Sequence, residues 1–151
     1  MFDTNKLEID ITNSLPPKYT STVSIFNKDS REIDKVLILL DKIKIIKDKL
    51  NIIGYFDDEN YQVKIIIDIY YSNKYTNSSW GDLDNYIKAI IDTLQTHIYN
   101  TKNLHPLLTS YYENVSYKLL KDDVNISTIF IKRHISKNEY DSYTILLEKD
   151  N

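Results

Sequence analysis

Residues 61–71 carry the pattern that most restricts how this 151-residue chain can fold. Apolar or aromatic side chains occupy every second position, at Tyr61, Val63, Ile65, Ile67, Ile69 and Tyr71. Because successive side chains of a β-strand point to opposite faces, this alternation predicts a strand with one face in a core. Gln62, Lys64 and Asp68 point the other way, and Ile66 between them predicts partial cover of the second face. The chain is therefore expected to fold around a sheet.

Two longer apolar patterns predict helices. Asp29 precedes Glu32 at capping-box spacing, and apolar residues then recur every three or four positions, which predicts a helix over about 30–51. A second amphipathic helix is predicted over about 84–98. Its apolar stripe consists of Ile87, Ile90, Ile91, Leu94 and Ile98.

Three further strands are predicted around these helices. Leu7, Ile9 and Ile11 alternate with polar residues, and Pro16-Pro17 ends that strand ahead of a loop over 13–28. Residues 124–132 and 143–147 form two more, joined by a polar turn around Asn138 and Asp141. This order predicts a single α/β or α+β domain over 1–151, in which a mixed sheet packs with two main helices.

Composition and charge exclude several classes of protein. The chain has no cysteine, which excludes disulfide scaffolds and thiolate metal sites. Its acidic start and short apolar runs predict neither a signal peptide nor a membrane span, so we expect a cytoplasmic or DNA-associated intracellular protein with no membrane partner. The net charge of −3 runs against the basic excess of most nucleic-acid binders. A cluster of metal-binding carboxylates would raise the number of acidic residues without excluding DNA. The local distribution of charge, and not the net charge, decides whether a nucleic acid binds.

Two acidic groups flank the second predicted helix. Asp82 and Asp84 lie at its start, and Asp84, Lys88 and Asp92 follow at intervals of four, which places them on one ridge beside the apolar stripe. Read as structure, these are a helix cap and two i,i+4 pairs worth a few tenths of a kcal/mol. Read as function, they form a divalent-metal site with the Asp122-Asp123 pair, since Mg²⁺ takes oxygen ligands that converge from separate elements.

The run DLDNYIKAIID at 82–92, followed by Asp122-Asp123 before an apolar strand, resembles the RusA family of Holliday-junction resolvases. Leu15-Pro16-Pro17 resembles the proline-bearing N-terminal segment of that family. The resemblance implies a RusA-like fold and a homodimeric endonuclease, dependent on Mg²⁺ with Mn²⁺ as a substitute, that resolves four-way DNA junctions in recombination and repair. It also implies roles for seven residues. The metal-binding carboxylates would be Asp82, Asp84 and Asp123 with Asp122 beside them, Lys88 would complete the catalytic set, and Asn85 and Asp92 would support it.

Two features depart from the family pattern. Ser78-Ser79-Trp80-Gly81 stands where the family usually has arginines before the first aspartate. The stretch between Asp92 and Asp122 is longer than in the family, which predicts an insertion at about 99–120. Within it, Pro106 is expected to open a short helix, and Tyr111, Tyr112 and Tyr117 to pack over the core.

The mechanism expected from these residues is metal-assisted phosphodiester hydrolysis. Lys88 is expected to stabilise charge on the phosphate, because a lysine among carboxylates stays protonated. Two alternatives remain open, namely a metal-dependent nuclease acting on other DNA structures and a non-catalytic DNA-binding or assembly module on the same fold. His97, His105 and His134 show no ligand spacing and are expected to be surface or packing residues.

Overall fold

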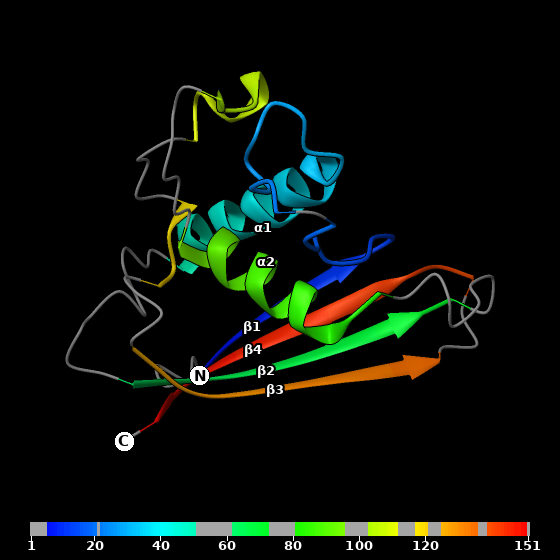
Figure 1. The fold of residues 1–151 in the computed structure, drawn as a ribbon. Coiled ribbons are helices and arrows are strands. Elements are labelled where there is room, and N and C mark those ends of the chain that lie inside the picture. The colour runs from blue at the N-terminus through cyan, green and yellow to red at the C-terminus, as the bar shows by residue number, and fades with distance from the viewer. Residues whose placement is uncertain are drawn as a thin grey trace.

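Four strands form one mixed sheet in the computed structural model (Figure 1). They are β1 (Lys6–Thr12), β2 (Gln62–Tyr71), β3 (Ile126–Ile135) and β4 (Ser142–Asp150), in the spatial order β1-β4-β2-β3. β2 and β3 are parallel, and β4 is antiparallel to both β1 and β2. The structure describes residues 6–20, 22–50 (without the side chain of Leu50), 62–72, 81–95, 103–111, 117–120, 125–135 and 139–150.

The alternation that predicted a strand over 61–71 is confirmed for Gln62–Tyr71. Every odd-numbered residue from Val63 to Tyr71 is buried, and the even-numbered residues are half-buried or exposed. The register aligns Ile67 with Ile145 of β4 and with Ile131 of β3, so one face of the sheet is apolar across three strands. This face forms the core of the molecule.

Both helices, α1 (Ile33–Leu50) and α2 (Leu83–Gln95), cover that one face of the sheet (Figure 1). The predicted helix over 84–98 begins one residue earlier, at Leu83, and residues 96–98 lie outside the described part of the chain. Leu39 and Ile43 of α1 pack with Tyr86 and Ile90 of α2 in the main core cluster.

The start of α1 differs from the prediction. The helix begins at Ile33 rather than near residue 30, and the predicted capping box does not form. Instead, the Ser30 hydroxyl accepts a hydrogen bond from the Glu32 backbone nitrogen at 3.2 Å. The Glu32 carboxylate is buried and accepts the Lys18 backbone N–H at 3.0 Å. The Glu32 side chain therefore makes a tertiary contact, whereas the local spacing predicted that it would cap the helix.

The connection from β3 to β4 also differs from a simple turn between neighbouring strands. β2 lies between them, so the chain must cross the end of β2. Asp141 fixes the described end of this crossing, because its carboxylate accepts the backbone N–H of buried Ser72 at 2.9 Å. Asn138 lies outside the described residues.

A second apolar cluster joins the N-terminal loop to the helices. Tyr19, Ile25 and Phe26 from that loop pack with Val36 and Leu40 of α1. Leu108 completes the cluster from η3 (Pro106–Leu108), the short helix predicted at Pro106. Tyr111 and Tyr117 pack against this cluster, whereas Tyr112 lies outside the described residues.

Together these elements form a single mixed α+β domain with a four-stranded sheet and two main helices. In the part of the chain that the structure describes, no helix is both long enough and apolar enough to cross a membrane.

Candidate functional site

Asp82 and Asp84 lie at the N-terminal end of α2, and both are exposed. Asp82 directly precedes the first helical residue, and its carbonyl accepts the Asn85 N–H at 3.2 Å. Neither carboxylate takes a hydrogen bond or an ion pair from another described residue. Free N–H groups and the helix dipole favour negative charge at this end of a helix. The two acids are therefore available to an external cation.

Lys88 and Asp92 continue the ridge, and both meet Tyr19 of the N-terminal loop. The Lys88 ammonium lies 4.5 Å from the centroid of the Tyr19 ring, which is a cation–π contact. The Tyr19 hydroxyl donates to the Asp92 carboxylate at 2.5 Å. Burial, followed by this bond to Asp92, raises the pKa of Tyr19 above its ordinary value. Asp92 lies about 12 Å along the helix from Asp84, so it positions the loop and does not join the two exposed acids.

Gly81 is the point where two cations from distant parts of the sequence meet. Its φ of +73° is in the left-handed region, which glycine adopts without a Cβ clash. A Cβ there would lie 3.2 Å from the Lys18 ammonium, so Lys18 rests directly against this residue. The Arg133 guanidinium reaches it from β3 and donates to the Gly81 carbonyl.

The Lys18 cation lies over a buried aromatic ring. The Lys18 ammonium lies 5.7 Å from the centroid of the Tyr86 ring. Burial and the neighbouring Tyr71 hydroxyl raise the pKa of Tyr86, and the nearby positive charge of Arg133 acts in the opposite direction. Arg133 therefore lies between the rings of the core and the exposed start of α2.

Cations and acids are mixed around the first turns of α2. Lys18 and Arg133 contact Gly81, and Lys88 contacts the ring of Tyr19. The acids are the exposed Asp82 and Asp84, Asp92 at the Tyr19 hydroxyl, and Glu32 at the Lys18 backbone nitrogen. This surface therefore offers groups both for a cation and for a phosphate.

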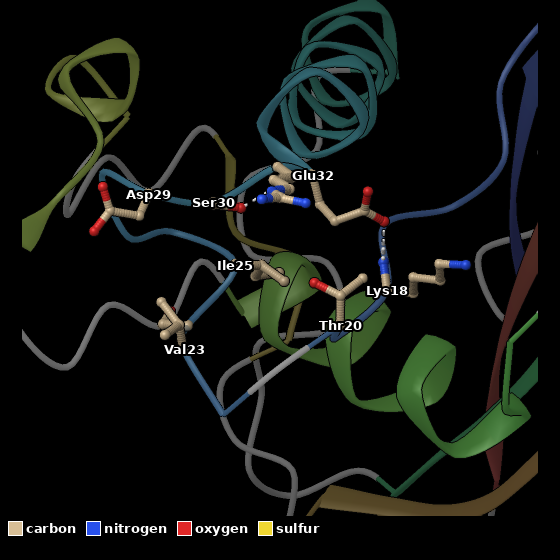
Figure 2. A pocket seen from close by; sticks show the side chains of 9 residues that line it. Lys18, Thr20, Val23, Ile25, Asp29, Ser30 and Glu32 are labelled. Carbon is tan, nitrogen blue, oxygen red and sulfur yellow. Dashed lines mark hydrogen bonds between the residues drawn. The ribbon is translucent and has the colours of Figure 1, made fainter.

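A cavity of about 360 Å³ adjoins this surface at Lys18. It lies between the N-terminal loop and the start of α1, and Figure 2 shows Glu32 at its edge, bonded to the Lys18 backbone nitrogen. Hydroxyl groups from Thr20, Ser24 and Ser30 line its wall.

The second predicted acidic pair, Asp122 and Asp123, lies outside the described residues. The described residues on either side lie near the far end of α2 and at the start of β3. Leu120 donates its backbone N–H to the Leu94 carbonyl at 3.2 Å, and Asn125 directly precedes β3. Among the described residues no group of three or more potential metal ligands gathers. Participation of Asp122 and Asp123 stays a prediction.

No family model matches the chain, and no curated protein matches its sequence.

Sequence reasoning found the ridge on α2 but not Lys18, Tyr19 or Arg133. Lys18 and Tyr19 follow Pro16-Pro17 in a segment that has no periodicity, and Arg133 is 52 residues from Gly81. Two of the histidines take structural contacts. His105 accepts the Leu107 N–H at the start of η3, and His134 pairs with Asp68 at 2.7 Å. His97 lies outside the described residues.

Proposed function

We propose that this chain is a divalent-metal-dependent endonuclease that cuts branched DNA, as the resemblance to the RusA family implies. One observation carries the proposal: Asp82 and Asp84, which take no hydrogen bond or ion pair from another described residue, lie next to Gly81, where Lys18 and Arg133 meet. Carboxylates beside cations suit a phosphodiester, because the acids hold a metal while the cations hold the phosphate.

The donor atoms available at this place fit a hard cation. Mg²⁺ prefers oxygen ligands and usually binds one or two protein carboxylates, with water and substrate phosphate in the other positions. Asp82 and Asp84 would hold it. Asp122 and Asp123, the predicted further ligands, lie outside the described residues, and their described neighbours Leu120 and Asn125 lie near the far end of α2 and before the start of β3. A cation held by these residues would supply an activated water and would neutralise charge on the phosphate.

The chain's own residues provide the remaining functions. Lys88 lies one turn beyond Asp84 and, as a protonated amine, stabilises charge that develops on the phosphate. Tyr19 fixes the path of the N-terminal loop through Asp92. Lys18 and Arg133 hold the neighbouring phosphates of the strand that is cut.

Cutting two opposed strands of a four-way junction requires two sites at a fixed separation. A two-fold homodimer provides them, so the proposal includes a homodimer and a RusA-like arrangement of the fold.

The test compares binding and cutting in the same gel for Asp84→Asn, Lys88→Ala and wild type. Asp84→Asn keeps the volume of the side chain and removes one ligand charge, so cutting is lost while junction binding persists or tightens. Lys88→Ala removes an exposed side chain together with its contact to the Tyr19 ring, and it lowers the cutting rate by roughly a hundredfold or more. Asp34→Asn, an acid in the first turn of α1, is the matched control and leaves both properties unchanged.

Two results would change the proposal. If both variants cut at the wild-type rate, the site is wrong. If wild type binds junctions tightly and never cuts with Mg²⁺ or Mn²⁺, the non-catalytic DNA-binding module is correct instead. A preference for flaps or plain duplex would identify a nuclease of different specificity.

A further inference from the structure

Tyr19 lies along α2 and is bound to the helix at two points. Its backbone N–H donates to the Asn85 carbonyl at 3.1 Å, and its hydroxyl donates to the Asp92 carboxylate at 2.5 Å. These two anchor points are about 10 Å apart along the helix axis. Between them the ring faces the Lys88 ammonium, whose nitrogen lies 4.5 Å from the ring centroid. This one buried side chain therefore spans the ridge on both sides of Lys88.

The contacts of Lys88 differ from those that the sequence predicts. Asp84 and Asp92 lie four residues before and after it, a spacing at which opposite charges on a helix can pair. Among the described residues, however, Lys88 makes no ion pair with either acid, and its contact is with the Tyr19 ring. The Asp92 carboxylate instead accepts the Tyr19 hydroxyl. The two halves of the predicted Lys88–Asp92 pair are therefore each bound to a different part of one tyrosine.

A ring and a carboxylate leave an ammonium in different states. A carboxylate compensates the positive charge and occupies N–H donors, whereas a neutral ring attracts the cation and leaves its net charge in place. Lys88 is also exposed, so an anion can reach it from solvent. Burial, followed by the bond to Asp92, raises the pKa of Tyr19, so the hydroxyl keeps its proton and continues to donate it to Asp92. The contact that separates Lys88 from Asp92 therefore persists at neutral pH.

We propose that Tyr19 is a positioning residue that keeps Lys88 apart from Asp92, and so keeps the Lys88 ammonium open to a phosphate oxygen. The use of this cation in cutting rests on the proposed function, whereas the separation of the two charges does not. Removing the hydroxyl releases Asp92, and Lys88 then leaves the ring and pairs with that acid. The ammonium stays on the helix but is no longer open to a phosphate.

The first measurement is independent of activity and follows the ε-methylene protons of Lys88 by NMR, with circular dichroism to confirm folding. In the wild-type protein the Tyr19 ring shifts these protons upfield of the ordinary lysine position. Tyr19→Phe keeps the ring but frees Asp92, so the protons move toward the ordinary position as the amine leaves the ring. Adding Asp92→Asn to Tyr19→Phe returns them upfield, because a neutral amide does not form an ion pair with the ammonium.

The second measurement is the rate of cutting at saturating four-way junction with Mg²⁺. Tyr19→Phe lowers this rate roughly fivefold, which corresponds to a surface ion pair at the strong end of the usual range. Adding Asp92→Asn raises the rate at least about twofold above that of Tyr19→Phe. A merely structural bond would show no such recovery, because both variants lack the bond between Tyr19 and Asp92.

Tyr111→Phe is the matched control. It removes another tyrosine–aspartate bond, from Tyr111 to Asp41 of α1 at 2.8 Å, and it leaves both the Lys88 signal and the cutting rate unchanged.

Three results overturn the proposal. The first is a Lys88 signal that Tyr19→Phe leaves as in wild type, the second is an undiminished cutting rate in Tyr19→Phe, and the third is a loss of rate that Asp92→Asn does not repair. If the wild-type protein cuts no junction with either metal, the proposed function fails. The NMR series then decides by itself whether Tyr19 separates Lys88 from Asp92.

Discussion

Tyr19 joins the N-terminal loop to the ridge that carries the proposed site. Its hydroxyl bonds Asp92 at 2.5 Å and its ring faces the Lys88 ammonium. Tyr19→Phe keeps the ring and removes the bond to a charged acceptor, so we expect the free energy of unfolding to fall by about 1–2 kcal/mol. Urea unfolding measures the change.

A second tyrosine provides the comparison for that prediction. Tyr111 donates to Asp41 at 2.8 Å, but this pair is exposed. Tyr111→Phe is expected to cost less than about 1 kcal/mol, because water replaces the lost partner. If Tyr19→Phe costs no more than Tyr111→Phe, the loop is held by packing alone and Asp92 has no positioning role.

Lys18 and Arg133 have no counterpart in the sequence pattern, and the proposed function assigns them to phosphate binding. Each phosphate contact adds about 0.9 to the slope of log affinity against log salt. Lys18→Ala should therefore weaken junction binding and reduce that slope by about one. Lys49→Ala, on the exposed side of α1, should leave the slope unchanged. An unchanged slope for Lys18→Ala would remove Lys18 from the DNA contact.

At the level of elements, Asp141 provides a described contact at the end of the crossing from β3 to β4. Asp141→Ala leaves the N–H of buried Ser72 without its acceptor, which should cost about 1–3 kcal/mol of stability. Asp141→Asn keeps an acceptor oxygen and should cost less than half as much. Equal losses in thermal unfolding would show that the charge of Asp141, and not its hydrogen bond, holds the crossing.

Most of the helices and strands were predictable from the sequence, because the spacing of apolar residues follows which side chains are buried. The alternation in β2 and the apolar stripe of α2 both correspond to the buried face found in the structure. The start of α1 was not predictable from local spacing, since Glu32 bonds a backbone group fourteen residues away. The order of the strands was also not predictable, because nothing in the sequence between β3 and β4 indicates that β2 separates them.

The candidate site was predictable only where it follows the helix period. Asp82, Asp84 and Lys88 are close in sequence, so the helix alone brings them together. The packing of the N-terminal loop brings Lys18 to Gly81, and the position of β3 at the sheet edge brings Arg133 there.

At the scale of the whole molecule, the net charge of −3 does not describe the start of α2. Lys18 and Arg133 reach Gly81 there from the N-terminal loop and from β3, beside the exposed Asp82 and Asp84. The proposed function therefore depends on this local arrangement of charges and not on the net charge.

The most direct test of the proposed function is incubation of the wild-type protein with a synthetic mobile four-way junction, with Mg²⁺ and with EDTA. Paired nicks in opposed strands that require Mg²⁺ or Mn²⁺ are the predicted result, with a linear duplex of the same sequence left uncut. Nicking that continues unchanged in EDTA would contradict the assignment of Asp82 and Asp84 as metal ligands. Absence of any cutting with either metal would contradict the enzyme itself.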